Sequence, residues 1–228
     1  MQLDDIVPWG RSFDEYRAMF ALTDADLGGK ILGCGDGPAS FNAEATARGA
    51  RVVSADPIYA FTAADISSRI HAVRPQIEAG VRAHPERYVW TRFAGVDDLV
   101  AARLSAMERF LVDYAAPGAS SRYVTGALPA LPFAAGQFDL ALVSHLLFMY
   151  SQHLGAEEHR RAVVELMRVS REVRIFPLLD LDGRPSPHVP HVQAAAASAG
   201  WSSDVLTVDY EFQRGGDAML RLSRVAAA

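Results

Sequence analysis

The chain has 228 residues, of which 50% are hydrophobic, and a formal net charge of −5. This length suits one α/β domain with a sizeable core, so we expect a single domain over residues 1–228. The net charge is negative, and the lysines and arginines form no cluster in the sequence. This argues against a nucleic-acid partner, because binding to DNA or RNA depends on neutralising phosphates.

The sequence also argues against membrane, disulfide and metal-binding classes. No apolar stretch approaches the ~20 residues that span a bilayer, and the N-terminus lacks the features of a secretory signal. We therefore expect no membrane partner and a cytoplasmic location. The single cysteine, Cys34, excludes an intrachain disulfide and a cysteine-based zinc site. His188 and His191 lie near Asp180 and Asp182, but their spacing matches no metal motif, so we predict no metal.

Helices and strands are expected to alternate in the first quarter of the chain. Ser12 and Glu15 have the spacing of a capping box, which opens a helix. The apolar pattern and the glycines then predict, in chain order, a helix over 12–22, a strand over 30–33, a helix over 38–48 and a strand over 51–55.

An excursion of about 60 residues follows, where a short helix usually leads to the third strand. Apolar residues at spacings of four, three and four from Ile66 to Ile77 predict one amphipathic helix, and a second is predicted over 96–111 beyond Pro85. We interpret residues 61–118 as a helical cap over a ligand site. The alternative is a homodimer interface, because both helices carry an apolar stripe.

The second half of the chain continues the alternation. The expected elements are strands over 122–125, 138–144 and 172–176, helices over 156–169 and 191–199, and two final strands over 205–212 and 218–222. The turn residues Arg214-Gly-Gly-Asp217 indicate that the last two strands form a hairpin. Alternating strands and helices predict a mostly parallel sheet.

A glycine-rich segment, Ile31-Leu-Gly-Cys-Gly-Asp-Gly37, is the most informative motif. Its glycines allow a sharp turn out of a strand and a close approach of the backbone to a ligand. Asp56 follows the next strand, where a carboxylate can accept hydrogen bonds from ribose hydroxyls. A dinucleotide fingerprint would need glycine at position 38, which is Pro38.

The G-x-G-x-G pattern of Gly33, Gly35 and Gly37 resembles motif I of class I S-adenosylmethionine-dependent methyltransferases. Three later segments resemble the "LPF…FDLV…ExxRV" run of that family: Leu128–Phe133, Gln137–Ser144 and Glu165–Val169. The resemblance covers roughly positions 27–60 and 122–224.

Two further segments resemble an uncharacterised bacterial group with "EVRIFPL" and "YEFQ-GG" runs, here Glu172–Leu178 and Tyr210–Gly216. That group implies no substrate. The Asn/Asp-Pro-Pro-Tyr/Phe motif is absent after the fourth strand, where Ser144-His-Leu-Leu-Phe148 stands. This again argues against a DNA or RNA acceptor.

The resemblance implies a Rossmann-like class I methyltransferase fold. Its mostly parallel seven-stranded sheet would carry a C-terminal antiparallel hairpin strand and a helical insertion between strands 2 and 3. It also implies the cofactor S-adenosylmethionine and, with the composition, a small-molecule acceptor. The residues implied in cofactor binding are Arg11, Tyr16, Gly33, Cys34, Gly35, Asp36, Gly37, Asp56, Pro57, Ala127, Leu128 and Ser144.

The chain departs from the family at two positions. An acidic residue often stands two positions before the first glycine, where this chain has Ile31, and an Asp often stands near the adenine, where it has Ala127. Either Asp36 and backbone groups replace these contacts, or the affinity for the cofactor is modest.

The candidate catalytic residues are His145, at the end of the fourth strand, and Tyr150. An imidazole with an ordinary pKa near ~6.5 could take a proton from the acceptor. Alternatively, His145 packs over the cofactor, and Tyr150 begins an ordinary helix. Two other functions stay open: a non-catalytic binding or scaffold protein on the same fold, and a nicotinamide-dependent reductase, against which Pro38 argues.

Overall fold

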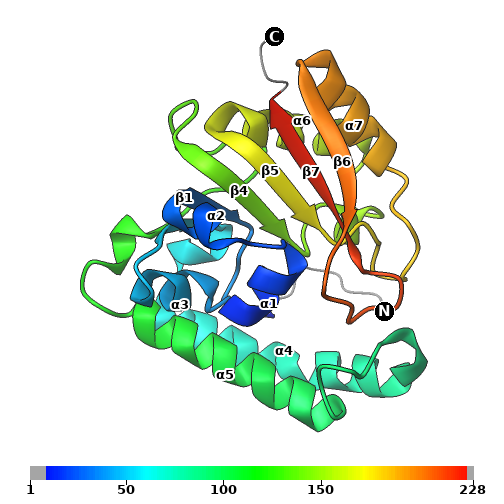
Figure 1. Ribbon diagram of the computed structural model, residues 1–228. Coiled ribbons are helices and arrows are strands. Elements are labelled where there is room, and N and C mark those ends of the chain that lie inside the picture. Colours follow the sequence, from blue (N-terminus) through cyan, green and yellow to red (C-terminus); the bar gives the residue numbers. More distant parts are fainter. Residues whose placement is uncertain (1–8, 225–228) are drawn as a thin grey trace.

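Seven strands form one sheet in the order β3-β2-β1-β4-β5-β7-β6 in the computed structural model, which describes residues 9–224 (Figure 1). The strands are β1 Lys30–Cys34, β2 Arg51–Ala55, β3 Tyr123–Val124, β4 Phe138–Ser144, β5 Ser170–Phe176, β6 Trp201–Thr207 and β7 Ala218–Arg224. Neighbours from β3 to β5 pair in parallel, whereas β7 is antiparallel to both β5 and β6. The predicted sheet and its antiparallel hairpin are therefore confirmed.

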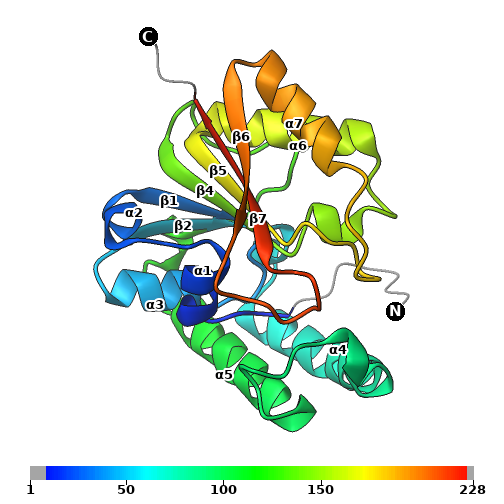
Figure 2. The ribbon, with the colours of Figure 1, turned by 45° about the vertical axis from the view of Figure 1, so that its right-hand side comes forward.

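Helices cover both faces of this sheet (Figure 2). They are α1 Phe13–Met19, α2 Asp24–Gly28, α3 Phe41–Ala47, α4 Ala63–Ala83, α5 Val96–Tyr114, α6 Ala156–Val169 and α7 Val189–Ser198. None of the helices in the described range is both long and apolar enough to span a bilayer. α1 and α3 pack on one face, and α6 and α7 lie side by side on the other.

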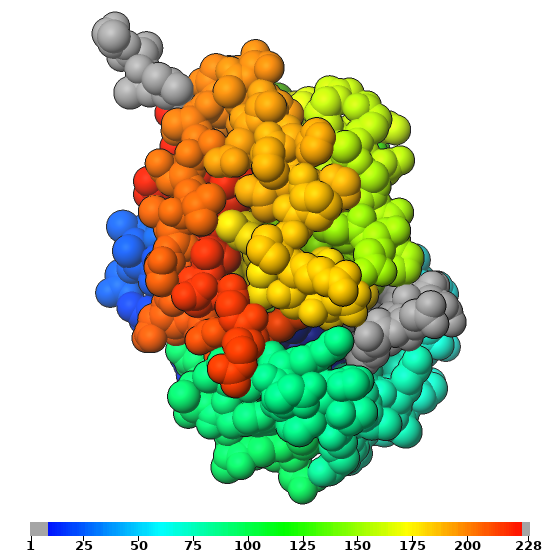
Figure 3. Space-filling view, turned by 90° about the vertical axis from the view of Figure 1, so that its right-hand side faces the viewer, coloured from blue at the N-terminus to red at the C-terminus, as the bar shows by residue number. Residues whose placement is uncertain are grey.

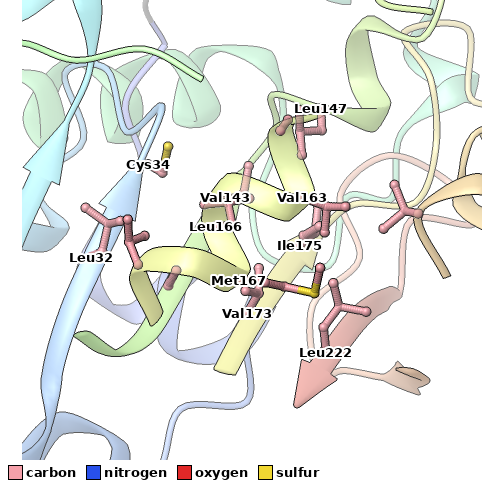
Figure 4. Close-up of a cluster of buried hydrophobic side chains, with 14 of the residues drawn as sticks. Leu32, Cys34, Val143, Leu147, Val163, Leu166, Met167, Val173, Ile175 and Leu222 are labelled. Carbon is pink, nitrogen blue, oxygen red and sulfur yellow. The ribbon is translucent and has the colours of Figure 1, made fainter. Parts of the chain in front are cut away.

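Alternating side chains of the strands supply the two cores. Leu32 and Val143 belong to the core under α6 and α7 (Figure 4), while their neighbours Ile31 and Leu142 belong to the core under α1 and α3. The parallel strands are thus apolar on both faces, which is typical of a sheet buried between helices.

The insertion between β2 and β3 consists mainly of α4 and α5, which pack against each other below the sheet in Figure 1. The predicted spacing holds, because Ile66, Ile70, Val73 and Ile77 are all buried. They form two apolar clusters with α5, whose members include Met107 and Phe110 near the sheet and Phe93 and Leu99 farther away.

Several boundaries differ from the prediction. The first helix ends at Met19 rather than Leu22, because Ala21 takes a left-handed φ of +46°. The helix after the glycine loop begins at Phe41, since the N–H of Ser40 is bonded to the carbonyl oxygen of Arg11. α7 begins two residues early, with Pro190 in its first turn, where proline costs no hydrogen bond.

The prediction of a strand over 205–212 is confirmed for residues 205–207 and wrong for residues 208–212. β6 spans Trp201–Thr207, and the pairing with β7 ends at Thr207 opposite Ala218, so residues 208–217 form the connection. Tyr210 and Phe212 have the alternating pattern of a strand, but their side chains pack against α1 and the insertion instead.

Candidate functional site

A cavity of about 1090 Å³ lies at the carboxyl ends of β1, β2 and β4. The insertion and the β6–β7 connection form part of its wall, and Figure 3 shows these two segments in contact. This volume slightly exceeds the ~300–1,000 Å³ usual for ligand pockets, so two small molecules can fit.

The structure brings all but one of the predicted site residues to this cavity. Its wall includes Arg11, Tyr16, Cys34, Gly35, Asp36, Gly37, Asp56, Pro57, Ala127, Leu128, Ser144, His145 and Tyr150. Gly33 does not line it. A Cβ added to Gly33 would lie 1.7 Å from a carboxylate oxygen of Asp36, so this glycine makes room for that side chain.

Asp36 is buried beneath the turn of the glycine loop. Its carboxylate accepts hydrogen bonds from the hydroxyl of Tyr16 at 2.8 Å and from the hydroxyl of Ser54 at 2.6 Å. Burial raises the pKa of Asp36 to about 6, although the two hydrogen bonds act in the opposite direction. A buried carboxylate with two neutral donors is a good partner for a cationic ligand group.

Asp56 fixes the glycine loop to the end of β2. Its carboxylate accepts hydrogen bonds from the N–H of Gly37 at 2.8 Å and the N–H of Ile58 at 2.9 Å. Burial raises its pKa, and these two hydrogen bonds oppose that shift. A carboxylate offers about four acceptor positions, so both oxygens keep capacity for a ligand in the cavity that Asp56 lines.

Arg11 places a positive charge on the cavity wall. Its Nη1 donates to the carbonyl oxygen of Trp9 at 3.0 Å, but its buried Nε has no hydrogen-bond partner among the described residues. Burial and the nearby Arg103 lower the pKa of Arg11. An unpartnered buried donor beside a second cation favours an anionic ligand group at this position.

Next to Arg11 lies a buried network that no local sequence pattern predicted. Arg103 of α5 donates to Glu15 of α1, and the hydroxyl of Tyr210 donates to the other oxygen of Glu15 at 2.8 Å. The network joins the insertion, the first helix and the β6–β7 connection. Tyr210 stands in the "YEFQ-GG" run, but Arg103 has no local sequence signal, because its partner lies 88 positions away.

His145 is held at the end of β4 with a left-handed φ of +52°. Its N–H donates to the carbonyl oxygen of Phe176 at 2.7 Å, and its Nδ1 lies 2.9 Å from the hydroxyl of Ser144. Burial, followed by the charges of Arg11 and Arg103, lowers the pKa of His145 well below its ordinary value. The imidazole is therefore neutral and weakly basic near pH 7.

Tyr150 is buried at the far end of the same loop, with its ring centroid 6.0 Å from that of His153. Leu128 and Pro57 add apolar surface to the cavity near Asp56, and Ala127 has no polar side chain to offer there. Within residues 9–224, no group of three or more histidine, cysteine or acidic side chains is arranged to hold a metal ion.

A short antiparallel pairing closes one side of the cavity. Tyr88, between α4 and α5, bridges to Gln213 of the β6–β7 connection. The N–H of Val89 donates to the carbonyl oxygen of Phe212, and the N–H of Arg214 donates to that of Arg87, both at 2.8 Å. The rest of the "YEFQ-GG" run thus ties the insertion to the sheet.

Comparison with known proteins gives one close relative and a shared fold. No family model matches the chain. The uncharacterized protein MJ0045 of Methanocaldococcus jannaschii is 31% identical over 225 residues, which cover 98% of this chain and 99% of that protein.

Two of the similar solved structures are those of methyltransferases. Magnesium protoporphyrin IX methyltransferase of Synechocystis PCC 6803 with bound SAM has a TM-score of 0.51 at 14% identity, covering 93% of this chain and 78% of that one. A SAM-dependent methyltransferase of Methanosarcina mazei has a TM-score of 0.48 at 11% identity, covering 88% and 94%. The first similarity and the strand order show the class I methyltransferase fold.

Proposed function

The chain belongs to the same family as the Methanocaldococcus jannaschii protein, and we propose that it is an S-adenosylmethionine-dependent methyltransferase that acts on a small molecule. One observation carries the proposal. The loop residues 34–37, which include Asp36, meet Asp56 at a single cavity, at the carboxyl edge of a sheet with methyltransferase strand order. This edge is where open α/β sheets bind their ligands.

The charges on the cavity wall fit the amino-acid end of S-adenosylmethionine, which carries an ammonium and a carboxylate. Asp36 would hold the ammonium, because it is a buried carboxylate whose hydrogen-bond donors among residues 9–224, Tyr16 and Ser54, are neutral. Arg11 would hold the carboxylate through the guanidinium N–H groups that do not donate to Trp9. Asp36 thus replaces the acidic residue that the family often has at the position of Ile31.

The nucleoside end fits the opposite part of the wall. Asp56 would accept hydrogen bonds from the ribose hydroxyls, and Pro57 and Leu128 would cover the adenine with apolar surface. Ala127 cannot bond to the adenine amino group through its side chain, so backbone groups would have to bind it.

The cofactor, when bound, supplies a methyl group already activated on a sulfonium. The chain therefore mainly has to hold donor and acceptor in line, and positioning alone can contribute several kcal/mol. His145 is suited to hydrogen bonding with the acceptor rather than to removing its proton, because its pKa is depressed. This favours an acceptor whose attacking atom needs no strong base.

The walls of the cavity support a small acceptor. Residues of α4 line it from below, and the pairing of residues 87–89 with 212–214 closes one side. We propose that the insertion over residues 61–118 acts as the cap of this site, which excludes water around the reacting groups.

Ligand-dependent thermal shift tests the proposal. S-adenosylmethionine and S-adenosylhomocysteine should each raise the melting temperature, because a ligand at 100 times its Kd stabilises the native state by about 2.7 kcal/mol. NAD and NADP serve as controls. Stabilisation by NADP without any by S-adenosylhomocysteine would support the reductase instead, and a response to none of them would reject both enzymes.

A further inference from the structure

The side of the cavity away from Asp56 differs in residue composition from the rest of the cavity wall. We call it the acceptor side and define it as the lining residues between 77 and 99 and between 181 and 213. It contains apolar and aromatic side chains together with His84 and Arg87, and none of its residues is acidic. Among residues 9–224, the acidic residues that line the cavity lie elsewhere: Asp36, Asp56, Asp65 and Glu158.

Aromatic rings form a rigid part of this side. Tyr88 stacks on Phe212 with 4.8 Å between ring centroids and 20° between ring planes. Trp90 and Phe93 each meet Phe212 edge to face. Trp90 and Phe93 do not line the cavity and only support Phe212. The backbone pairing of residues 87–89 with 212–214 fixes Tyr88 and Phe212, so these two rings offer a preformed surface for a flat apolar group.

The basic residues of this side keep hydrogen-bonding capacity. The guanidinium of Arg87 is 3.8 Å from a carboxylate oxygen of Asp182, which is longer than a hydrogen bond, and its side chain is 36% exposed. Nδ1 of His84 is 3.5 Å from Glu86. Neither Asp182 nor Glu86 lines the cavity, so a molecule inside it meets the basic groups first.

We infer that the acceptor is a small molecule with a flat apolar body and a negatively charged group, which Arg87 and His84 bind while the body packs on the Tyr88 and Phe212 surface. The inference rests on the proposed function, since Asp56 and the glycine loop must place the nucleoside at the other end of the cavity. An acceptor with a positive charge is disfavoured, because the acceptor side offers it no carboxylate.

Calorimetry on the full chain saturated with S-adenosylhomocysteine tests this inference. The probes are three naphthalenes of similar shape: 2-naphthoate, 2-naphthalenemethanol and 2-naphthylmethylamine. We expect 2-naphthoate to bind most tightly and the amine most weakly. Arg87→Gln should weaken 2-naphthoate about tenfold, as expected for the loss of a charge-assisted hydrogen bond, and should leave the alcohol unchanged.

Arg160→Gln is the matched control, because Arg160 is an exposed arginine of α6 that pairs with Glu157 outside the cavity. Tight binding of the amine, no binding of 2-naphthoate, or an equal loss of both probes in Arg87→Gln would overturn the inference. Normal binding of S-adenosylhomocysteine in the same experiment would leave the proposed function standing, whereas its absence would reject both.

Discussion

Glu15 of α1 and Arg103 of α5 form a buried ion pair that joins the first helix to the insertion. The side chain of Arg103 is only 1% exposed and that of Glu15 9%. Tyr210 completes the network from the β6–β7 connection. Three segments that surround the cavity are therefore held together by one charged cluster, next to the wall residue Arg11.

Breaking this pair should destabilise the fold strongly. Glu15→Gln and Arg103→Met should each lower the free energy of unfolding by about 3–5 kcal/mol, because each leaves a buried charge without its partner. Urea unfolding followed by circular dichroism measures the loss. The double variant should lose less than the sum of the two. Arg160→Met, which breaks an exposed pair, should cost at most about 1 kcal/mol. Equal small losses in all variants would show that the buried pair is unimportant.

The same pair predicts a dependence of stability on acid. Burial is the largest single influence and would raise the pKa of Glu15, but the charge of Arg103 and its hydrogen bond, with the charge of Arg11 and the bond from Ser12, together lower the pKa to about 2. The ionised carboxylate therefore stabilises the fold above its ordinary pKa of 4.5, and this contribution is lost as the pH falls towards 2. Unfolding measured between pH 5 and pH 2.5 should show a steeper loss in the unaltered chain than in Glu15→Gln. Parallel curves would contradict the shift.

The raised pKa of Asp36 predicts the opposite effect of pH on stability, at higher pH. Because burial raises its pKa to about 6, its protonated form stabilises the free chain, and this contribution is lost as the pH rises from about 4 through 6. An ammonium bound to Asp36 requires the ionised form. The affinity for S-adenosylhomocysteine should thus increase from pH 5 to pH 7, as calorimetry can measure. Asp36→Asn should remove the increase, and Glu158→Gln, at an exposed wall position, should keep it. An unchanged increase in Asp36→Asn would exclude this contact.

Removal of the Asp56 carboxylate should lower the affinity for the cofactor. Asp56→Ala should weaken the binding of S-adenosylhomocysteine by about 1–3 kcal/mol, because buried hydrogen bonds of the ligand and of the loop are left unmet. Since the carboxylate also holds Gly37 and Ile58, the melting temperature of the free variant must be measured as well. Full affinity in a folded Asp56→Ala chain would end the assignment of Asp56 to the ribose.

Local patterns predicted much of the fold. The capping box of Ser12 and Glu15 forms as expected, and β4 has the predicted bounds, because a continuous apolar strand between turns has few alternatives. The glycine loop and Asp56 also predicted the place of the cavity, because each directly follows a strand of the sheet. Each is a local signal whose geometry the chain fixes within a few residues.

Features that depend on distant partners were not predictable. The sequence pattern places Tyr210 and Phe212 in a strand. In the structure the hydroxyl of Tyr210 donates a hydrogen bond to Glu15, and the ring of Phe212 stacks on Tyr88. Arg103 reads as one polar residue on a helix, and only the folded chain brings it to Glu15. The depressed pKa of His145 likewise arises from burial and from two arginines that lie far from it in sequence.

His145 should stay neutral at pH values where a free histidine is charged. NMR of imidazole-labelled protein should show its ring unprotonated at pH 6, because burial and the charges of Arg11 and Arg103 oppose protonation. Arg11→Met should raise its pKa. Once an acceptor is known, His145→Ala tests catalysis directly. A base would give a loss in turnover of about 10²-fold or more with unchanged cofactor affinity, whereas packing alone would change the affinity. Titration of His145 near its ordinary pKa would restore the role of general base.

The insertion should respond to ligands if it is a cap and to protein concentration if it is a dimer interface. Hydrogen exchange distinguishes the two, since it reports local opening. For a cap, the amides of α4 that face the cavity, around Ile77 and Val81, should gain protection when S-adenosylhomocysteine and 2-naphthoate are present. The N–H of Val89 should gain it too, because its bond to Phe212 closes the wall. Val112 offers an internal comparison, since its side chain is 71% exposed on α5 and does not line this cavity. If the insertion is a dimer interface, protection around Val112 would instead rise with protein concentration and would not change with either ligand. That result would contradict the proposal of a cap.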